Sequence, residues 1–304
     1  MTSIENVAKV VCEMDKHLRD ELLVKDGKQQ KKKLWENTHI KHQIDRRDNG
    51  DTFSLSDHIR AMVYSMLSSG IRWERVEDSI DIKTGRIVLI DELFHQFDEE
   101  YIINNSPEFF VNGIFTLHCG SQYTKAQMEA LKWNINLFKQ WISKYSSIDS
   151  FYQQFITDNR SLNKLVKQLS DYGSKDKLRQ LGIPLVAEYL KNVGYSIAKP
   201  DRHICRILGN TALGCFNIIE VPKYKAIDYI SDIAKEIGKT EAEVDYILWM
   251  YCADGFGEIC TKKPNYTTKS KKAPKCNICK AKEICKAYQN SINQHSSCPR
   301  FDPR

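Results

Sequence analysis

Four cysteines near the C-terminal end of this 304-residue chain have the spacing of a metal site. Cys276, Cys279 and Cys285 follow a C-x2-C-x5-C pattern, and Cys260 precedes Cys276 with fifteen residues between them. A C-x2-C pair places two thiolates on one side of a tight turn, where both can bind one metal centre. Four thiolates hold either structural zinc or a [4Fe–4S] cluster. The spacing therefore predicts a four-cysteine metal site and leaves the metal open.

The segment between Cys260 and Cys276 is rich in lysine. A metal bound at both ends would hold this segment in place, and a positioned basic loop suits contact with phosphates. We interpret the other lysine cluster, residues 28–33, as a solvated surface. The basic residues of the segment are Lys262, Lys263, Lys269, Lys271, Lys272 and Lys275.

A second candidate for chemistry is Asp201, which follows a proline at the start of a segment with helical apolar spacing. Viewed locally, an aspartate in this position is a helix N-cap, worth about 1 kcal/mol. A catalytic carboxylate is the alternative. The choice between them depends on the elements that surround Asp201 in the chain.

Composition and spacing indicate a helical protein of ordinary solubility. The chain has 41% hydrophobic and 28% charged residues, and it contains no apolar run of membrane-spanning length and no signal peptide. Ten cysteines in such a chain indicate a reducing compartment, so we expect a cytoplasmic (nucleoid) or nuclear protein that is not secreted. Apolar residues recur at helical spacing nearly throughout. The exception is residues 80–90, which we predict as strand or irregular structure.

Residues 178–193 have the pattern of a helical hairpin. A short helix is expected to end at Leu181, and Gly182-Ile183-Pro184 forms a tight turn before a second helix from about Leu185 to Val193. The first N–H groups of a helix have no intrahelical acceptor, and they lie at the positive end of its dipole. Such a helix start can bind a phosphate.

In the order of these features the chain resembles the helix-hairpin-helix base-excision DNA glycosylases, and among them the iron–sulfur branch typified by endonuclease III. Gly182, Pro184 and Asp201 match the Gly/Pro hairpin and the catalytic aspartate of that superfamily. Residues 201–206, DRHICR, resemble its D-T-H-I/V-x-R motif. Upstream, residues 120–126, GSQYTKA, are similar to its G-x-Y-x-x-K-A segment, with the tyrosine one place late. The likeness spans about residues 55–286.

The resemblance implies an all-α fold of two helical lobes. A six-helix barrel lobe with the helix-hairpin-helix would span residues 52–194, and the second lobe would combine residues 1–51 and 195–304. The active site would lie in the cleft between the lobes. The implied partner is double-stranded DNA, and we expect a monomer that contacts no membrane.

The resemblance also assigns roles to residues. Asp201 would be the catalytic residue of a DNA glycosylase, and the four cysteines would hold a [4Fe–4S] cluster rather than zinc. The expected DNA contacts are Lys125, Gly182, Ile183, Pro184, Leu185, Arg72, Lys262 and Lys263.

Three departures from the family pattern bear on the activity. Bifunctional members carry a nucleophilic lysine just after the hairpin, where this chain has apolar residues 185–187, and we expect neither Lys191 nor Lys199 to replace it. Without that amine no Schiff base forms, so we expect a monofunctional enzyme. The first cysteine interval is fifteen residues instead of six. Gly70 stands where the family has a glutamine that fills the gap in the base stack, and Arg72 or Trp73 could take its place.

Alternative functions remain open from the sequence. The chain could be a bifunctional glycosylase and abasic-site lyase that uses another lysine, or a non-catalytic helix-hairpin-helix DNA-binding protein in which Asp201 is only a cap. A zinc-dependent regulator is a more distant alternative. The damaged, mismatched or modified base that a glycosylase would excise is not indicated by any motif.

Overall fold

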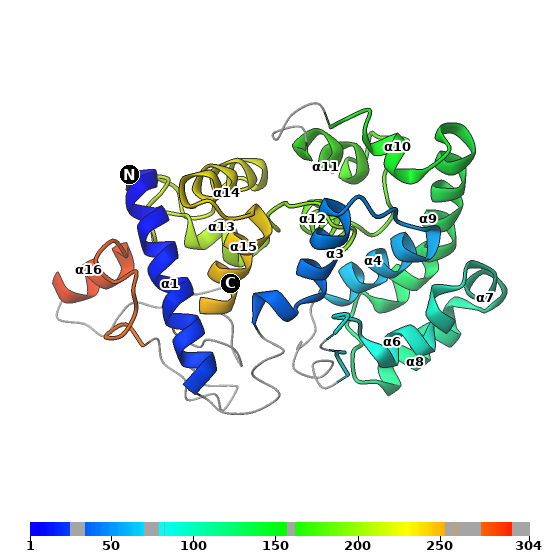
Figure 1. Ribbon diagram of the computed structural model, residues 1–304, viewed down its shortest axis with the longest axis horizontal. Helices are drawn as coiled ribbons and strands as arrows, with labels where there is room; N and C mark the ends of the chain where they lie inside the picture. The colour runs from blue at the N-terminus through cyan, green and yellow to red at the C-terminus, as the bar shows by residue number, and fades with distance from the viewer. Residues whose placement is uncertain are drawn as a thin grey trace. The chain divides into compact units, whose positions relative to one another are not determined.

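Every regular element in the described part of the chain is a helix (Figure 1). The computed structural model describes residues 1–24, 34–69, 79–81, 83–156, 162–252, 259 and 275–293. Within these residues, strand-like pairing is limited to one antiparallel bridge between Ile80 and Ile87. The predicted all-α class is therefore confirmed. None of the helices in these ranges is long and apolar enough to cross a membrane.

The helices form two compact units. Unit 1 comprises Met1–Trp35 and Ala198–Arg304, and unit 2 comprises Glu36–Ile197. The first boundary predicted from the sequence, after residue 51, is wrong because residues 36–51 belong to unit 2. The second boundary lies after residue 197 instead of after residue 194.

Both differences have one structural cause, which is the packing of α3 (His39–Asp48) against residues 193–195. Arg47 Nε donates a hydrogen bond to the Val193 carbonyl oxygen at 2.8 Å. The Arg47 guanidinium also lies 3.9 Å from the ring centre of Tyr195. These contacts attach both ends of the segment 36–197 to one core.

Unit 2 is built around α4 (Leu55–Leu67), which is buried along most of its length. Ser54 begins this helix with a capping box, in which Ser54 and Asp57 each bind the other's backbone N–H. α12 (Ile183–Asn192) makes the most extensive contact with α4. The boundary between the units falls within η1 (Trp35–Asn37). The other elements of unit 2 are α6 (Val88–Leu93), η2 (His95–Phe97), α7 (Glu99–Asn104), α8 (Pro107–Thr116), α9 (Thr124–Tyr145), α10 (Ile148–Tyr152) and α11 (Leu162–Ser170).

A chain of buried polar groups joins α4, α10 and α12. His58 Nδ1 is 2.6 Å from the hydroxyl oxygen of Tyr189, which is 2.7 Å from that of Tyr152. Burial lowers the pKa of His58 to about 4, so the imidazole is neutral near pH 7. These hydrogen bonds fix the orientation of α12 in the core.

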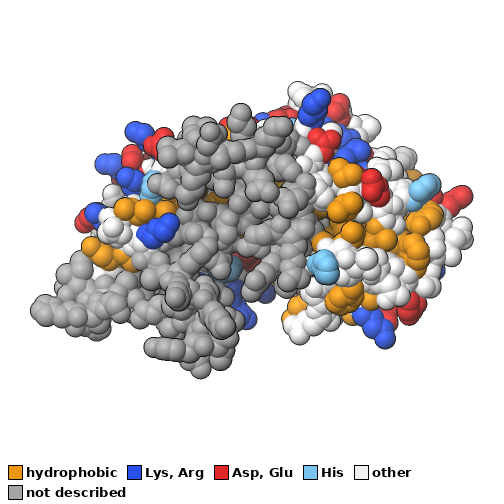
Figure 2. All heavy atoms as spheres, turned by 90° about the horizontal axis from the view of Figure 1, so that it is seen from below, with side chains coloured by type: hydrophobic (Ala, Val, Ile, Leu, Met, Phe, Trp, Pro, Cys, Tyr) orange, Lys and Arg blue, Asp and Glu red, His pale blue; other side chains and the backbone are white. Residues whose placement is uncertain are grey.

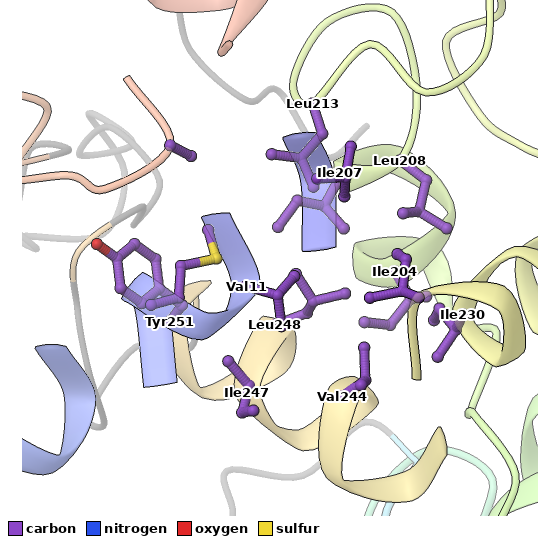
Figure 3. Close-up of a cluster of buried hydrophobic side chains, with 14 of the residues drawn as sticks. Val11, Ile204, Ile207, Leu208, Leu213, Ile230, Val244, Ile247, Leu248 and Tyr251 are labelled. Carbon is purple, nitrogen blue, oxygen red and sulfur yellow. The ribbon is translucent and has the colours of Figure 1, made fainter. Parts of the chain in front are cut away.

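Unit 1 has its own apolar core, formed by α1 (Ile4–Val24), α13 (Arg202–Ile207), α14 (Lys223–Ile237) and α15 (Glu241–Cys252) (Figure 3). Val11, Ile204 and Leu248 are almost completely buried in it. α16 (Lys286–Asn293) completes the described helices. α13 is short, and its position depends on this core.

The segment 80–90 differs in part from its prediction. The bridge between Ile80 and Ile87 closes a turn through Gly85, but α6 begins directly afterwards at Val88. A Cβ atom at Gly85, whose φ is +66°, would lie 2.3 Å from the Cα atom of His39. The turn therefore requires glycine for its close contact with α3.

On the one face that Figure 2 shows, the charges of the described residues do not mark a binding face by themselves. On the face shown in Figure 2, Lys and Arg side chains are interspersed with Asp and Glu side chains, and hydrophobic groups lie between them. A site for an anionic partner must therefore be argued from individual residues.

Candidate active site

The hairpin loop, which we define as residues 171–182, consists of successive turns between α11 and α12. The predicted short helix ending at Leu181 is wrong, because α11 ends at Ser170. Asp171 Oδ1 accepts the Gly173 N–H at 3.0 Å, and Ser174 Oγ accepts the Asp176 N–H at 3.1 Å. These side chains take the place of helical carbonyl acceptors, and so they favour turns.

Three backbone amides at the start of α12 have no acceptor. The helix begins at Ile183 with Gly182 as its N-cap, which supplies no capping side chain. Within the described residues, the N–H groups of Gly182, Ile183 and Leu185 donate to nothing, and Pro184 has no N–H. A Cβ atom added to Gly182 would meet no atom within 4 Å. We call these three N–H groups the hairpin amides; they form an open site for an anion at a helix N-terminus.

Two side chains, one from α4 and one from the hairpin loop itself, hold the carbonyl groups on either side of the hairpin amides. Ser65 Oγ on α4 donates to the Leu185 carbonyl at 2.5 Å. Lys177 Nζ donates to the carbonyls of Ser170 at 2.8 Å and Leu181 at 3.1 Å. Burial lowers the pKa of Lys177 from its ordinary value. Sequence reasoning missed Ser65 and Lys177, because no local motif marks them; Ser65 and Leu185 are 120 residues apart.

Lys125, a predicted DNA contact, lies in the first turn of α9. Its side chain is 74% exposed, and its Nζ is 4.0 Å from Glu129 Oε1. An exposed ion pair of this kind contributes little to stability. The ammonium group is therefore available to a phosphate.

Asp201 is the N-cap of α13, as the local interpretation of the sequence predicts. Its Oδ1 accepts the Ile204 N–H at 3.0 Å, and its carbonyl oxygen accepts the Cys205 N–H at 2.9 Å. Its Oδ2 accepts no hydrogen bond from the described part of the chain. The side chain is half-buried. One carboxylate oxygen thus fixes the side chain, and the other can bind a substrate or a water molecule.

The groups around Asp201 are structural. Cys205 is buried, and burial together with the charges of Asp201 and Glu220 raises the pKa of its thiol to about 12. The thiol is therefore neutral and not a nucleophile. Arg206 Nε donates to Glu220 Oε2 at 3.3 Å, so this arginine pairs within the fold. His203 is exposed.

No lysine occupies the start of α12, where residues 185–187 are apolar. Lys191 lies near the end of the same helix, and its side chain is only 5% exposed. Its Nζ is 3.0 Å from Glu188 Oε2. A buried amine held by a carboxylate cannot reach the sugar of a DNA substrate, so Lys191 is a poor candidate for the nucleophile.

The cysteine segment, residues 275–285, is only part of the predicted metal site. Cys276, Cys279 and Cys285 lie in it, and the backbone folds back by turns, with the Cys285 N–H donating to the Ala281 carbonyl at 2.8 Å. Tyr251 fixes the middle of the segment, because its hydroxyl accepts the Lys280 N–H at 2.8 Å. Among the residues described, no three His, Cys, Asp or Glu side chains are grouped to hold a metal ion.

Several predicted residues lie outside the described ranges. They include the fourth cysteine ligand, so the metal prediction is left without a test. The same is true of the predicted wedge into the base stack and of the basic loop. These residues are Cys260, Gly70, Arg72, Trp73, Lys262 and Lys263.

Comparison with known proteins gives structural matches only. No protein-family model and no curated protein sequence matches the chain. One similar structure is the Methanocaldococcus jannaschii 8-oxoguanine glycosylase/lyase in complex with a 15mer DNA containing 8-oxoguanine. Its identity is 16% and its TM-score 0.47, over 80% of this chain and 95% of that chain.

A second similar structure is the 8-oxoguanine DNA glycosylase of the same organism, with 19% identity and a TM-score of 0.44 over 77% of this chain and 95% of that chain. At this level of similarity neither structure assigns a role to a residue of this chain. The chemistry must therefore be argued from the hairpin amides and Asp201.

Proposed function

We propose that this protein is a helix-hairpin-helix DNA glycosylase, which hydrolyses the N-glycosidic bond of a flipped, damaged, mismatched or modified base in double-stranded DNA. One observation carries the proposal. A helix with three N-terminal amides that find no acceptor among the described residues is followed, in the order typical of that superfamily, by Asp201, one of whose carboxylate oxygens has no partner among those residues either. The N–H groups can bind a DNA phosphate. The Asp201 carboxylate can stabilise the positive charge that develops on the sugar.

Asp201 performs the chemical step. When the bond between C1′ and the base nitrogen breaks, its electron pair leaves with the base and the sugar gains oxocarbenium character. The carboxylate stabilises that charge, and its free oxygen can take a proton from the water that attacks C1′. The carboxylate then releases this proton to the solvent and the departing base takes one up, so the reaction consumes one water molecule and leaves Asp201 ionised. The bond from Ile204 N–H to Oδ1 holds the carboxylate in one orientation during this step.

The hairpin amides bind a phosphate of the target strand. The N–H groups are fixed before DNA arrives, because Ser65 and Lys177 hold the neighbouring carbonyls. The hairpin amides therefore lose little conformational freedom when DNA binds. The target nucleotide must leave the base stack for its C1′ atom to be attacked, which costs a few kcal/mol. Phosphate contacts at the hairpin and at Lys125 offset part of that cost.

The enzyme is monofunctional in this proposal. A lyase needs an amine that forms a Schiff base with the sugar, and the start of α12 offers none. Borohydride treatment during the reaction should therefore trap no covalent complex between the protein and DNA. A trapped complex would establish a bifunctional glycosylase and lyase, and mapping the adduct would identify its lysine.

The four cysteines hold a [4Fe–4S] cluster in this proposal. Their thiolates suit the cluster, and zinc is the alternative for the same set of ligands. When bound, the cluster has a structural role: it ties the segment that contains Lys262 and Lys263 to unit 1. The protein is expected to act as a monomer in the cytoplasm or nucleus, where a reducing environment keeps its thiols available.

The test is mass spectrometry of the bases released from DNA by the purified protein. The DNA should carry oxidised, alkylated, deaminated, mismatched and hypermodified bases, with 8-oxoguanine among them. Asp201→Asn is the informative variant, since asparagine caps a helix as well as aspartate does and the fold is preserved. Asp98→Asn is its matched control, because Asp98 caps α7 in the same way, accepting the Tyr101 N–H at 2.7 Å.

Release of one base by the wild type and by Asp98→Asn, but not by Asp201→Asn, would support the proposal and name the substrate. Equal release by all three proteins would remove Asp201 from the mechanism. DNA binding without any release would favour the alternative function, a non-catalytic DNA-binding protein in which Asp201 is only the cap of α13.

A further inference from the structure

An exposed arginine lies over an exposed tryptophan in unit 2, close in sequence to the hairpin amides. The guanidinium carbon of Arg179 is 3.4 Å from the ring centre of Trp133, which is the distance of a cation–π stack. Trp133 is 49% exposed. Within the described residues, Arg179 forms no ion pair with a carboxylate. Its charge is therefore open to a partner from outside the protein.

A buried asparagine fixes the backbone of Arg179. The N–H of Arg179 donates to Asn134 Oδ1 at 2.8 Å, and Asn134 Nδ2 donates to the Arg179 carbonyl at 3.0 Å. Asn134 is fully buried and directly follows Trp133 on α9. One helix therefore supplies both the ring beneath the guanidinium and the amide that holds its backbone.

The rest of the hairpin loop is held from inside as well. Asp176 is buried and accepts hydrogen bonds from Trp141 Nε1 at 3.1 Å and Gln168 Nε2 at 2.6 Å. Gln180 follows Arg179 with a left-handed φ of 62°, in a turn closed by the hydrogen bond from the Leu181 N–H to the Leu178 carbonyl at 3.3 Å. The loop thus presents the Arg179 side chain on a rigid support.

The surroundings of Arg179 favour an anionic partner. The segment 162–181 carries only two acidic residues, and Asp176 is one of them, buried and hydrogen-bonded. Arg179 and Gly182 are three residues apart, so their Cα atoms are no more than about 11 Å apart. The cationic residues of the segment are Lys164, Lys167, Lys175, Lys177 and Arg179.

We propose that Arg179, stacked on Trp133, binds a backbone phosphate of the same DNA strand that the hairpin amides contact. This inference rests on the proposed function and adds a second phosphate site to it. A phosphate fits better than a stacked base, because the guanidinium already covers the indole ring. Arginine binds phosphate through two parallel N–H groups, and the stack on Trp133 holds these groups in place before DNA binds.

The experiment measures binding of the full-length protein to a duplex with a tetrahydrofuran abasic-site analogue, by fluorescence anisotropy over a series of salt concentrations. Each phosphate contact adds about 0.9 to the slope of log K against log salt. Arg179→Ala should lower that slope by about 0.9 and weaken binding about tenfold. Arg179→Lys should keep the slope and still bind less tightly, because lysine makes no bidentate contact.

Lys144→Ala is the matched control. Lys144 lies on α9, as Trp133 does, and its Nζ is 5.0 Å from the ring centre of Tyr145. This variant should leave the slope unchanged. An unchanged slope for Arg179→Ala, or an equal loss for Lys144→Ala, would overturn the phosphate site while wild-type binding still supports the proposed function. A wild type that does not bind the duplex would overturn both.

Discussion

The hairpin loop of unit 2 and the cysteine segment of unit 1 differ in the protein side chains that hold them. The hairpin loop is fixed by protein side chains alone, through the hydrogen bonds of Asn134, Asp176 and Lys177. The described part of the cysteine segment is held by a part-buried bond from the Lys280 N–H to the Tyr251 hydroxyl and by an exposed bond from Gln289 Nε2 to the Glu283 carbonyl at 2.6 Å. Its three described thiols form no ligand group by themselves.

This difference suits the two roles proposed above. A site that must receive DNA rapidly and repeatedly benefits from groups that are ordered in the free protein. A segment with a structural role can become ordered when it binds a cofactor. The free energy of cofactor binding then contributes directly to folding. The predictions that follow test whether the two regions respond independently.

The largest effect is expected from loss of the cofactor. Cys279→Ala should abolish iron binding and destabilise unit 1, because structural metal sites contribute on the order of 10 kcal/mol to folding. Hydrogen exchange should then show lost protection in α15 and α16 but unchanged protection in α12. Iron and sulfide analysis of the protein purified without oxygen is the direct measurement.

Cys12→Ala is the control for this experiment, since Cys12 is exposed on α1 and lies outside the cysteine pattern. It should retain full iron content. Stoichiometric zinc without iron in the wild type would favour the zinc alternative, and absence of any metal would show that the four-cysteine prediction is wrong.

An intermediate effect is expected from Lys177→Met. Methionine fills similar space, but the carbonyls of Ser170 and Leu181 lose their charged donor. The free energy of unfolding should fall by about 2 kcal/mol, and DNA binding should weaken because the hairpin amides become less ordered. Chemical denaturation and anisotropy measure the two effects.

Lys175→Met removes an exposed lysine from the same loop and should leave stability nearly unchanged. If both variants lose stability equally, net charge and not the two carbonyl contacts maintains the loop.

The smallest effect on stability, with the opposite sign, is expected from Gly182→Asp. The φ of Gly182 is −87° and a Cβ atom there meets nothing, so the new carboxylate can cap α12 and gain about 0.5 kcal/mol. The same carboxylate occupies the anion site, and DNA binding should fall at least tenfold. Gly182→Asn adds the cap without the charge, so its loss of binding should be smaller. Undiminished DNA binding by Gly182→Asp would show that no phosphate sits on the hairpin amides.

The parts of the site that the sequence predicts are those with local signals. Gly182 and Pro184 mark the start of α12, and Pro200 with the apolar residues after Asp201 marks the cap of α13. In each case the residue types restrict the backbone within one helical turn. The prediction of a helix that ends at Leu181 is wrong because the side chains of Asp171 and Ser174 accept backbone N–H groups and favour turns.

The residues that hold these elements have no local signal. Asn134 and Arg179 are 45 residues apart, and Arg47 and Val193 are 146 residues apart. The hydrogen-bond partner of such a buried amide or guanidinium lies far away in the sequence and comes near only in the folded chain. The spacing of residue types along the sequence therefore does not predict the boundary of unit 2 or the hydrogen bonds that support the hairpin loop.

The central claim is that Asp201 breaks the glycosidic bond and does not merely cap a helix. The most direct measurement is the single-turnover rate of base release for wild type and Asp201→Asn on the identified substrate, with DNA affinity measured in parallel. The account predicts a rate at least ~100-fold lower for the variant, with unchanged affinity and unchanged thermal stability. Equal rates for the two proteins would contradict it.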